Sequence, residues 1–409
     1  MSAPRPAGPE DAILGVAPRS VVEPASVEEA VEAMQACARD RLRLTFAGGG
    51  TLLGLGAAPT GLDVLLRTRR LDRVVDHAPS DQIVVAEAGL TLDGLQRALA
   101  LHGQRLALDP PLGAQATLGG IVAANAFGPR RTRFGTARDL IIGVTLVRAD
   151  GVRAKGGGRV VKNVAGFDLP RLLVGSLGTL GLIATVTFRL HPLPEAAATL
   201  VLERLGAAQV RALVRSLRDA QVEPTSALLL AEGGALRLGL RFEGFGPGVR
   251  QQGERLAALA AVAGLACEWL HEAGAAAFWA RHDAVRTGGA VRVRLAAPPS
   301  ALEPVLRDAV APLAAALPGG GAVLDTLDGC GFACGGAADP AGAVAGLRSA
   351  RQALVALGGS LVLEVAPPEV RSGVDAWGPP PPSLEVMRRL KARLDPEGRL
   401  APGRFVGGI

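Results

Sequence analysis

The sequence predicts an α+β protein that is built in two parts. Short β-branched and aliphatic runs alternate with amphipathic stretches of helical period along the chain. The pattern changes near residues 193–194, after which strands and helices recur in two comparable rounds. The 409 residues, 49% of them hydrophobic, are enough for two or three domains. These observations favour two mixed domains over a single all-α or all-β fold.

The first half mixes helices and strands around glycine-rich segments. Ser26 is the expected N-cap of a helix that extends to Arg39, and Glu29 completes a capping box. Thr91 begins a second helix, which Gly103 ends. Strands are expected at 42–46, 63–67, 83–87 and 140–147. Because helices alternate with strands, this half is of mixed type.

The second half predicts two rounds of strands and helices. The first has strands at 199–202, 227–230 and 236–242 and helices at 209–220 and 249–263. The second has strands at 290–295, 323–326 and 360–364 and helices at 302–313 and 341–357. Two such rounds indicate a ferredoxin-like antiparallel sheet with helices on one face. A Pro/Gly-rich linker at 366–382 and a basic amphipathic helix at 383–394 follow.

The composition argues against a nucleic-acid partner. The formal net charge is +6, but only three of the 44 basic residues are lysines. Aromatic residues make up 3% of the chain and tyrosine is absent, so the stacking platforms that accompany basic grooves are missing. We therefore expect no nucleic acid among its ligands.

The cysteine and hydropathy patterns point to a reducing cytosol. Only Cys330 and Cys334 are close in sequence, and their spacing fits neither a zinc site nor iron–sulfur ligands. The N-terminal residues lack the apolar region of a signal peptide, and no apolar window is long enough to span a membrane. We expect free buried thiols, no metal and a cytoplasmic location.

Three glycine clusters lie in the first half, at 48–50, 113–128 and 175–181. Glycine lets the main chain approach an anion closely, but it also serves ordinary tight turns, so one cluster alone leaves both open. Leu53 and Pro59 stand where a G-x-G-x-x-G motif would need glycine, and there is no Gly-Lys pair for a Walker A loop. A Rossmann NAD site and a P-loop are therefore not expected.

The order of the glycine motifs resembles a known flavoprotein superfamily. The motifs are Ala47-Gly48-Gly49-Gly50-Thr51, then Thr117-Leu118-Gly119-Gly120 with Asn125 and Gly128, then Gly175 to Ile183. Over roughly residues 20–195 the chain resembles the FAD-binding domain of the vanillyl-alcohol oxidase and p-cresol methylhydroxylase superfamily. Segments 158–168 and 394–404 resemble more specifically the FAD-binding E subunits of bacterial glycolate oxidases. Phe167 stands where relatives commonly carry tyrosine, so no hydroxyl acts there.

The resemblance implies a two-part FAD-binding domain with a cap. The expected boundaries are a flexible N-terminus 1–19, the FAD-binding domain 20–195, a cap or substrate domain 196–374 and a segment 375–409 that returns to the FAD domain. One FAD is expected without a covalent bond, because relatives that tether flavin use His or Cys in the binding loops. Neither residue occurs in 46–56 or 109–139.

The resemblance also implies which residues bind the cofactor. Most of these residues are expected to contact the pyrophosphate or the flavin end of FAD. Gly178, Gly181 and Ile183 are expected at the adenine end. Asn125 is placed to hydrogen-bond the flavin ring or ribityl chain, although asparagine also stabilises turns. The implied set is Ala47, Gly48, Gly49, Gly50, Thr51, Pro111, Thr117, Leu118, Gly119, Gly120, Asn125, Gly128, Gly178, Gly181 and Ile183.

A substrate site is less clearly marked. Oxidising a small 2-hydroxy acid requires a base for the hydroxyl proton and a cation for the carboxylate. His282 is a candidate base, Arg292 and Arg294 share a strand face as a candidate clamp, and Lys162 is a candidate cation near the flavin. Each of these four residues could instead have a structural role or be an ordinary solvent-exposed side chain. The five histidines are scattered, so the metal cluster of related dehydrogenases is not expected.

Two hypotheses of function remain open. In the first, the chain is an FAD subunit that oxidises glycolate or a related 2-hydroxy acid itself. In the second, it is a flavin-bearing scaffold or electron relay without its own substrate site. The resemblance implies a second FAD-containing subunit and an iron–sulfur subunit as partners in either case. Contact with the inner face of the membrane is then expected only through those partners.

Overall fold

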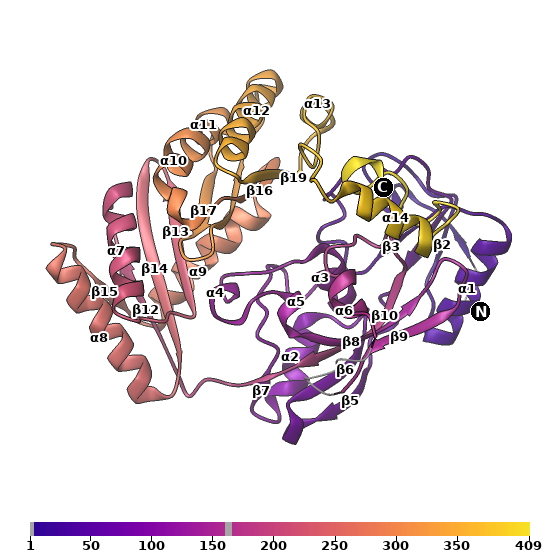
Figure 1. Cartoon of the computed structure of the whole chain (residues 1–409), viewed down its shortest axis with the longest axis horizontal. Helices are drawn as coiled ribbons and strands as arrows, with labels where there is room; N and C mark the ends of the chain where they lie inside the picture. The colour runs from indigo at the N-terminus through magenta and orange to yellow at the C-terminus, as the bar shows by residue number, and fades with distance from the viewer. Residues whose placement is uncertain (1–3, 160–165) are drawn as a thin grey trace. The chain divides into compact units, whose positions relative to one another are not determined.

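The computed structural model describes residues 4–159 and 166–409, which form two compact units (Figure 1). Unit 1 contains Met1–Gly128, Gly135–Leu193 and Pro379–Ile409, and unit 2 contains Pro129–Phe134 and Pro194–Gly378. The chain thus crosses between units after Gly128, Phe134, Leu193 and Gly378. The domain boundaries expected from the sequence, 20–195, 196–374 and 375–409, stay predictions.

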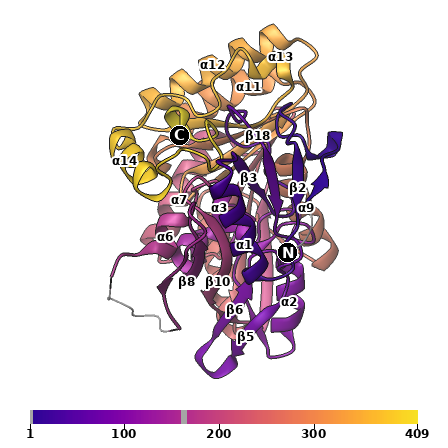
Figure 2. The same cartoon turned by 90° about the vertical axis from the view of Figure 1, so that its right-hand side faces the viewer.

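A small, mainly parallel sheet begins unit 1. Its strand order is β1 (Arg5–Pro6), β2 (Ser20–Val22), β4 (Val64–Arg67) and β3 (Leu44–Ala47). Helix α1 (Val27–Arg39), labelled in Figure 2, belongs to this part of the chain. It buries Ala30 and Met34 in a core that also takes residues from the second sheet of this unit, among them Val147 and Leu182. Ser26 caps α1 by accepting from the N–H of Glu29, as expected. The Glu29 carboxylate accepts from the N–H of Ala25, so the predicted capping box is displaced by one residue.

The second sheet of unit 1 is antiparallel. Its order is β5 (Val74–Ala78), β6 (Ile83–Glu87), β10 (Leu182–Arg189), β8 (Ile141–Val147) and β9 (Arg153–Gly157). The connecting elements are α2 (Leu92–Ala100), α3 (Leu118–Ala124), α5 (Ala137–Leu140), α6 (Leu169–Leu173) and the short pair β7 (Gln104–Arg105) and β11 (His191–Pro192). Single 3-10 turns are η1 (Pro9–Asp11) and η2 (Pro79–Asp81).

Helix α3 differs from the sequence expectation. Residues 117–124 were grouped with the glycine loops, but they form a helix with Thr117 as its N-cap. Two adjacent glycines in the first turn, each costing about 1 kcal/mol in helix propensity, hid the helical pattern. The helix is stabilised by burial, because Leu118 and Ile121 are almost completely inaccessible to solvent.

The C-terminal segment extends the parallel sheet. After α14 (Leu384–Leu394) the chain passes beside β3, where Leu400 forms a parallel bridge with Leu44. Leu400 is fully buried in the same core as α1. The chain ends in the turn η5 (Val406–Gly408). The tail is therefore an integral part of unit 1 and not a peripheral extension.

Unit 2 contains one eight-stranded antiparallel sheet made of two ferredoxin-like halves. The first half is β12 (Ala196–Leu202), α7 (Ala207–Asp219), β13 (Ser226–Glu232), β14 (Ala235–Gly244), α8 (Gly246–Val262) and β15 (Glu268–Leu270). The second is β16 (Val291–Ala296), η3 (Pro299–Ala301), α10 (Leu302–Val305), η4 (Leu306–Val310), α11 (Ala311–Ala316), β17 (Gly321–Asp325), β18 (Cys330–Gly335), α12 (Pro340–Ala356) and β19 (Ser360–Val365), followed by α13 (Pro368–Arg371). The sheet order is β15-β12-β14-β13-β17-β18-β16-β19. Each half has the same strand order, so the predicted ferredoxin-like repeat is confirmed.

The expectation that all helices cover one face of this sheet is wrong. On β14, Leu238 and Leu240 pack into the main core, whereas Gly239 faces Phe278 of helix α9 (Glu272–Thr287). Because neighbouring residues of a strand point to opposite faces, α9 lies on the face away from that core. Helix α9 was missed because its alanine-rich sequence has only a weak apolar stripe.

Segment 129–134 is held to unit 2 by consecutive polar side chains. Arg130 pairs with Glu243 at 2.8 Å, Arg131 with Asp328, and Arg133 with Glu223. Thr132, in the short helix α4 (Arg131–Phe134), hydrogen-bonds the carboxyl group of Asp325. Burial and the nearby Asp328 raise the pKa of Asp325 to about 7.

The raised pKa of Asp325 predicts a pH-dependent stability. Since its pKa in the unfolded chain is about 3.9, this carboxyl group stabilises the fold fully below about pH 4, and the contribution is lost as the pH rises through about 7. In Asp325→Asn, which cannot ionise, the fall in unfolding free energy between about pH 5 and about pH 8 should shrink by on the order of 2 kcal/mol. Urea unfolding of both proteins across this range measures it, and equal slopes would contradict the assignment.

Candidate functional site

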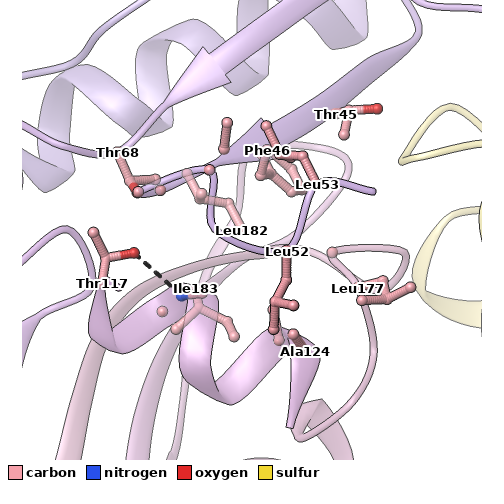
Figure 3. Close-up of a pocket in the computed structure, with 18 of the residues that line it drawn as sticks. Thr45, Phe46, Leu52, Leu53, Thr68, Thr117, Ala124, Leu177, Leu182 and Ile183 are labelled. Atoms are coloured by element: carbon pink, nitrogen blue, oxygen red, sulfur yellow. Dashed lines mark hydrogen bonds between the residues drawn. The ribbon is translucent and has the colours of Figure 1, made fainter. Parts of the chain in front are cut away.

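A pocket in unit 1 lies where β3, the following glycine loop, helix α3 and segment 177–183 meet (Figure 3). It holds about 770 Å³ of space that no atom occupies, part of which is open solvent. Its lining residues are Thr45, Phe46, Ala47, Gly48, Gly49, Gly50, Thr51, Leu52, Leu53, Thr68, Thr117, Gly119, Gly120, Ala123, Ala124, Leu177, Gly178, Gly181, Leu182, Ile183 and Arg404.

The glycine loop after β3 presents a run of unused hydrogen-bond donors. Within residues 4–159 and 166–409, no carbonyl or side chain accepts from the main-chain N–H groups of residues 48–52. Gly50 has a φ of +81°, a left-handed conformation that turns successive N–H groups toward a common centre. All five residues line the pocket. The loop therefore has the chemistry of an anion nest.

Glycine is required in this loop for a second reason, which is close packing. A Cβ atom on Gly49 would lie 1.7 Å from the carbonyl oxygen of Gln115, and one on Gly48 would lie 2.0 Å from Oγ1 of Thr117. The loop thus rests directly against segment 115–117. The sequence argument attributed these glycines to the approach of a ligand, whereas the structure shows that the protein's own main chain already fills that side.

The first turn of α3, which adjoins the loop, also lines the pocket. Oγ1 of Thr117 accepts a hydrogen bond from the N–H of Gly120 at 3.4 Å, drawn as a dashed line in Figure 3. Gly119 packs against Ala88 and its N–H donates to the carbonyl of that residue at 2.7 Å. Gly120 is exposed to solvent and lines the pocket. Two motifs far apart in sequence therefore meet at one pocket.

The predicted cofactor residues divide into two groups. Those that line the pocket are Ala47, Gly48, Gly49, Gly50, Thr51, Thr117, Gly119, Gly120, Gly178, Gly181 and Ile183. Four do not line it: Leu118 is a core residue, Gly128 packs on the main chain of Asp109, Asn125 caps α3, and Pro111 lies in a loop. The cofactor contacts of both groups stay predictions.

Asn125 has two features that bear on its role. It adopts a left-handed conformation, with a φ of +46°, at the C-terminus of α3, which agrees with a turn-stabilising function. Its buried Oδ1 atom has no hydrogen-bond partner within the described part of the chain. Because the two ends of an amide side chain are assigned by their surroundings, one polar end of Asn125 is left for a further partner.

The sequence reasoning missed several residues that line the pocket. Thr45 and Phe46 lie on β3 just before the glycine loop, and Thr68 follows the neighbouring strand β4. Leu52 and Leu182 form apolar walls (Figure 3). The position of the two strands side by side would have indicated Thr68. Arg404 was noticed only as part of a terminal motif, with no role assigned.

The pocket suits a ligand with a phosphate part and an apolar part. Its lining combines residues 48–52, whose N–H groups have no acceptor in the described chain, with the hydroxyl-bearing Thr51 and Thr117 and with aliphatic side chains. Arg404 is the charged residue of the lining, and its sign matches an anion. Among the described residues that line the pocket there is neither a His nor a Cys.

Comparison with known proteins agrees with this chemistry. Residues 18–155 match the family described as FAD binding domain. The chain is 36% identical over 162 residues to the glycolate oxidase subunit GlcE of Escherichia coli (strain K12), covering 39% of this chain and 46% of that protein. It is 37% identical over 183 residues to a D-lactate dehydrogenase of Archaeoglobus fulgidus, covering 43% and 41%. These matches span less than half the length of either relative.

A solved structure shows the fold of the whole chain. The chain superimposes on p-cresol methylhydroxylase with a TM-score of 0.74 and 15% sequence identity, covering 95% of this chain and 89% of that one. Residues 18–155 thus match an FAD-binding domain. Over 95% of its length the chain has the fold of p-cresol methylhydroxylase, which agrees with the resemblance seen in the sequence.

Three of the candidate catalytic residues, His282, Arg292 and Arg294, are not part of this pocket's lining. The fourth, Lys162, lies outside the described residues. His282 is buried on α9 in unit 2, with Nδ1 2.9 Å from Oδ1 of Asp283. Arg292 and Arg294 do share a face of β16, but Arg292 donates to the carbonyls of residues 286 and 287, at 3.2 and 3.0 Å.

Arg294 is engaged by a buried acid. It donates to Oε1 of Glu364 at 2.8 Å, and Glu364 is only 2% exposed. Burial acts to raise the pKa of Glu364, but the guanidinium groups of Arg294 and Arg286 outweigh it and keep that pKa below its ordinary value. Both strand arginines thus have structural partners, and a carboxylate clamp would have to compete with them.

The remaining sequence expectations concern metals, thiols and the membrane. The described residues contain no group of three or more metal-binding side chains. All four cysteines are free, and burial raises the pKa of Cys330 to about 11. None of the helices in residues 4–159 and 166–409 is long and apolar enough to cross a bilayer.

Two glycines with the same local geometry allow a matched test of the pocket. Gly120 and Gly94 each occupy the third position of a helix whose threonine N-cap accepts from the glycine N–H, but only Gly120 lines the pocket. Aspartate in a first helical turn is compatible with the helix dipole. In Gly120→Asp the carboxylate faces the expected phosphates, so FAD affinity should fall on the order of a hundredfold, about 2.7 kcal/mol.

Gly94→Asp is the control and should retain FAD like the wild type. Bound flavin is measured as FAD released when the protein is precipitated with acid, and circular dichroism checks folding. Release of the flavin also checks that it is held without a covalent bond. Equal FAD content in the two folded variants would place the cofactor elsewhere.

Proposed function

We propose that this pocket binds FAD through its pyrophosphate and that the protein is an FAD subunit of a 2-hydroxy-acid oxidoreductase. The observation that carries the proposal is that residues 48–52, whose N–H groups have no acceptor in the described chain, line one pocket together with Gly120. The names of the relatives support the substrate class, because one is a glycolate oxidase subunit and another a D-lactate dehydrogenase.

The chain's own residues then have defined tasks. The N–H groups of 48–52 and the hydroxyls of Thr51 and Thr117 bind and orient the phosphates. The walls formed by Phe46, Leu52 and Leu182 exclude water from the apolar part of the cofactor. When bound, FAD would supply the capacity to accept two electrons from an oxidisable substrate, as a hydride or its equivalent.

The proposed substrate is a small 2-hydroxy acid. Glycolate and D-lactate share an α-hydroxyl and a carboxylate, so either fits the names of the relatives. The strand arginines that we considered for the carboxylate are already bonded within unit 2. This observation favours the second candidate function, in which the chain carries flavin electrons for a partner subunit that holds the substrate.

The relative GlcE is named as a subunit of glycolate oxidase, and this name supports partner subunits for the present chain as well. We propose a second FAD-containing subunit and an iron–sulfur subunit as the route for electrons that leave the flavin. The cysteines of this chain do not supply a cluster, because their spacing is wrong for one. Attachment to the membrane, in this proposal, is made by the partners.

The two candidate functions predict different behaviour of the purified, FAD-loaded chain. It is mixed anaerobically with glycolate and, separately, with D-lactate, and the flavin absorbance is followed. If the chain oxidises the substrate itself, one of the two bleaches the flavin without any other protein. In the relay function, bleaching requires the co-purified partner subunits. No bleaching by either acid in the intact assembly would contradict the 2-hydroxy-acid proposal while leaving FAD binding intact.

A further inference from the structure

The C-terminal segment reaches the cofactor pocket, and its role is not covered by the proposed function. Leu400 bridges β3, the strand that leads directly into the glycine loop. The N–H of Ala401 donates to the carbonyl of Leu44 at 2.7 Å, and the N–H of Leu44 donates to the carbonyl of Arg399 at 2.9 Å. The tail is therefore aligned with the strand that positions residues 48–52.

Arg404 extends from this tail into the lining of the pocket. It is 3% exposed, and its Nη2 atom donates to the carbonyls of Leu53 at 2.9 Å and Leu55 at 2.7 Å. These carbonyls belong to the end of the same glycine loop. One buried guanidinium therefore fixes the loop and lines the pocket beside it.

A second buried cation of the tail holds another wall of the pocket. Nζ of Lys391 donates to the carbonyl of Thr179 at 2.8 Å, and Thr179 lies between the pocket residues Gly178 and Gly181. Lys391 also donates to Asp395 and to the carbonyl of Leu400, both at 2.7 Å. It thus ties the segment 177–181 to the part of the tail that runs beside β3.

The backbone just before Arg404 is strained. Ala401 is completely buried and has a φ of +44°, a conformation that costs an L-residue on the order of 1 kcal/mol. Gly403 has a φ of +78°. Strain of this kind persists where the surrounding structure requires one path of the chain, and it is concentrated at ligand sites. Here the path delivers Arg404 to the loop.

We propose that Arg404 is a positioning residue for FAD: it holds the loop 48–55 in the shape that presents its free N–H groups, with Lys391 acting in the same way on segment 177–181. This inference rests on the proposed seat of FAD in the pocket. The C-terminal tail, although distant in sequence from the glycine loop, would thus hold the cofactor site in its binding conformation. The positive charge of Arg404 also suits the anion that the loop receives.

Arg399 offers a matched control. It lies on the same tail, is 5% exposed and donates to main-chain carbonyls, those of Cys37, Leu42 and Ala149. None of these three residues lines the pocket. Replacing Arg399 therefore removes a buried tail guanidinium of the same kind without releasing a pocket loop.

The test compares Arg404→Met with Arg399→Met in the full chain stripped of flavin. FAD affinity is measured by quenching of flavin fluorescence, and the unfolding midpoint is measured with and without saturating FAD. We expect Arg404→Met to weaken FAD binding at least about tenfold and to shrink the FAD-induced rise in the midpoint. Arg399→Met should lower both midpoints equally and leave the affinity within about twofold of wild type.

A purely structural role for Arg404 predicts that both variants lose stability alike and keep the affinity of the wild type, and this result would overturn the inference. If Arg404→Met does not fold, Arg404→Lys and Arg399→Lys give the same comparison, because lysine keeps the charge but lacks the planar fork. The Gly120→Asp variant distinguishes an error in the proposed FAD site from an error in the proposed role of Arg404. If Gly120→Asp binds FAD normally, the seat of FAD is wrong; if it loses FAD and Arg404→Met does not, only the positioning role is wrong.

Discussion

The close contact between the glycine loop and segment 115–117 is the constraint on which the rest of the site depends. Gly49 approaches the carbonyl of Gln115 so nearly that any side chain would collide with main chain. This contact brings the end of β3 against the N-terminus of α3, and so places two sets of N–H and hydroxyl donors around one pocket. A phosphate site made of main-chain donors needs such fixed geometry, because the donors have no side-chain freedom with which to adapt.

The free N–H groups of the loop also need support from outside it. Within the described residues these N–H groups have no acceptor, and residues 48–50 carry no side chain with which to pack. The tail supplies a further restraint, because Arg404 bonds the carbonyls of Leu53 and Leu55 while Leu400 is buried beside β3. The pocket is thus assembled from segments that are distant in sequence, and Arg404 follows Ile183, the preceding lining residue, by more than 200 positions.

The sequence predicted the helices and strands that have a clear hydrophobic periodicity or a capping residue. It did not predict elements whose conformation is determined by tertiary packing. Strand β6 and the cap at Ser26 were predicted closely, because alternation and capping are local signals. Helix α3 was missed because Gly119 and Gly120 have low helix propensity and are retained for close packing and pocket access. The glycine motifs indicated the site, but Arg404 and Thr68 join it only through the arrangement of strands, which no local pattern reveals.

The most direct measurement of the central claim is hydrogen exchange of the flavin-free protein before and after FAD is added. The account predicts that FAD slows exchange of the main-chain N–H groups of residues 48–52 most strongly, because they have no partner within the described chain, and that peptides covering 117–124 and 177–183 are protected as well. Exchange at residues 48–52 that stays as fast with saturating FAD as without it would contradict the account.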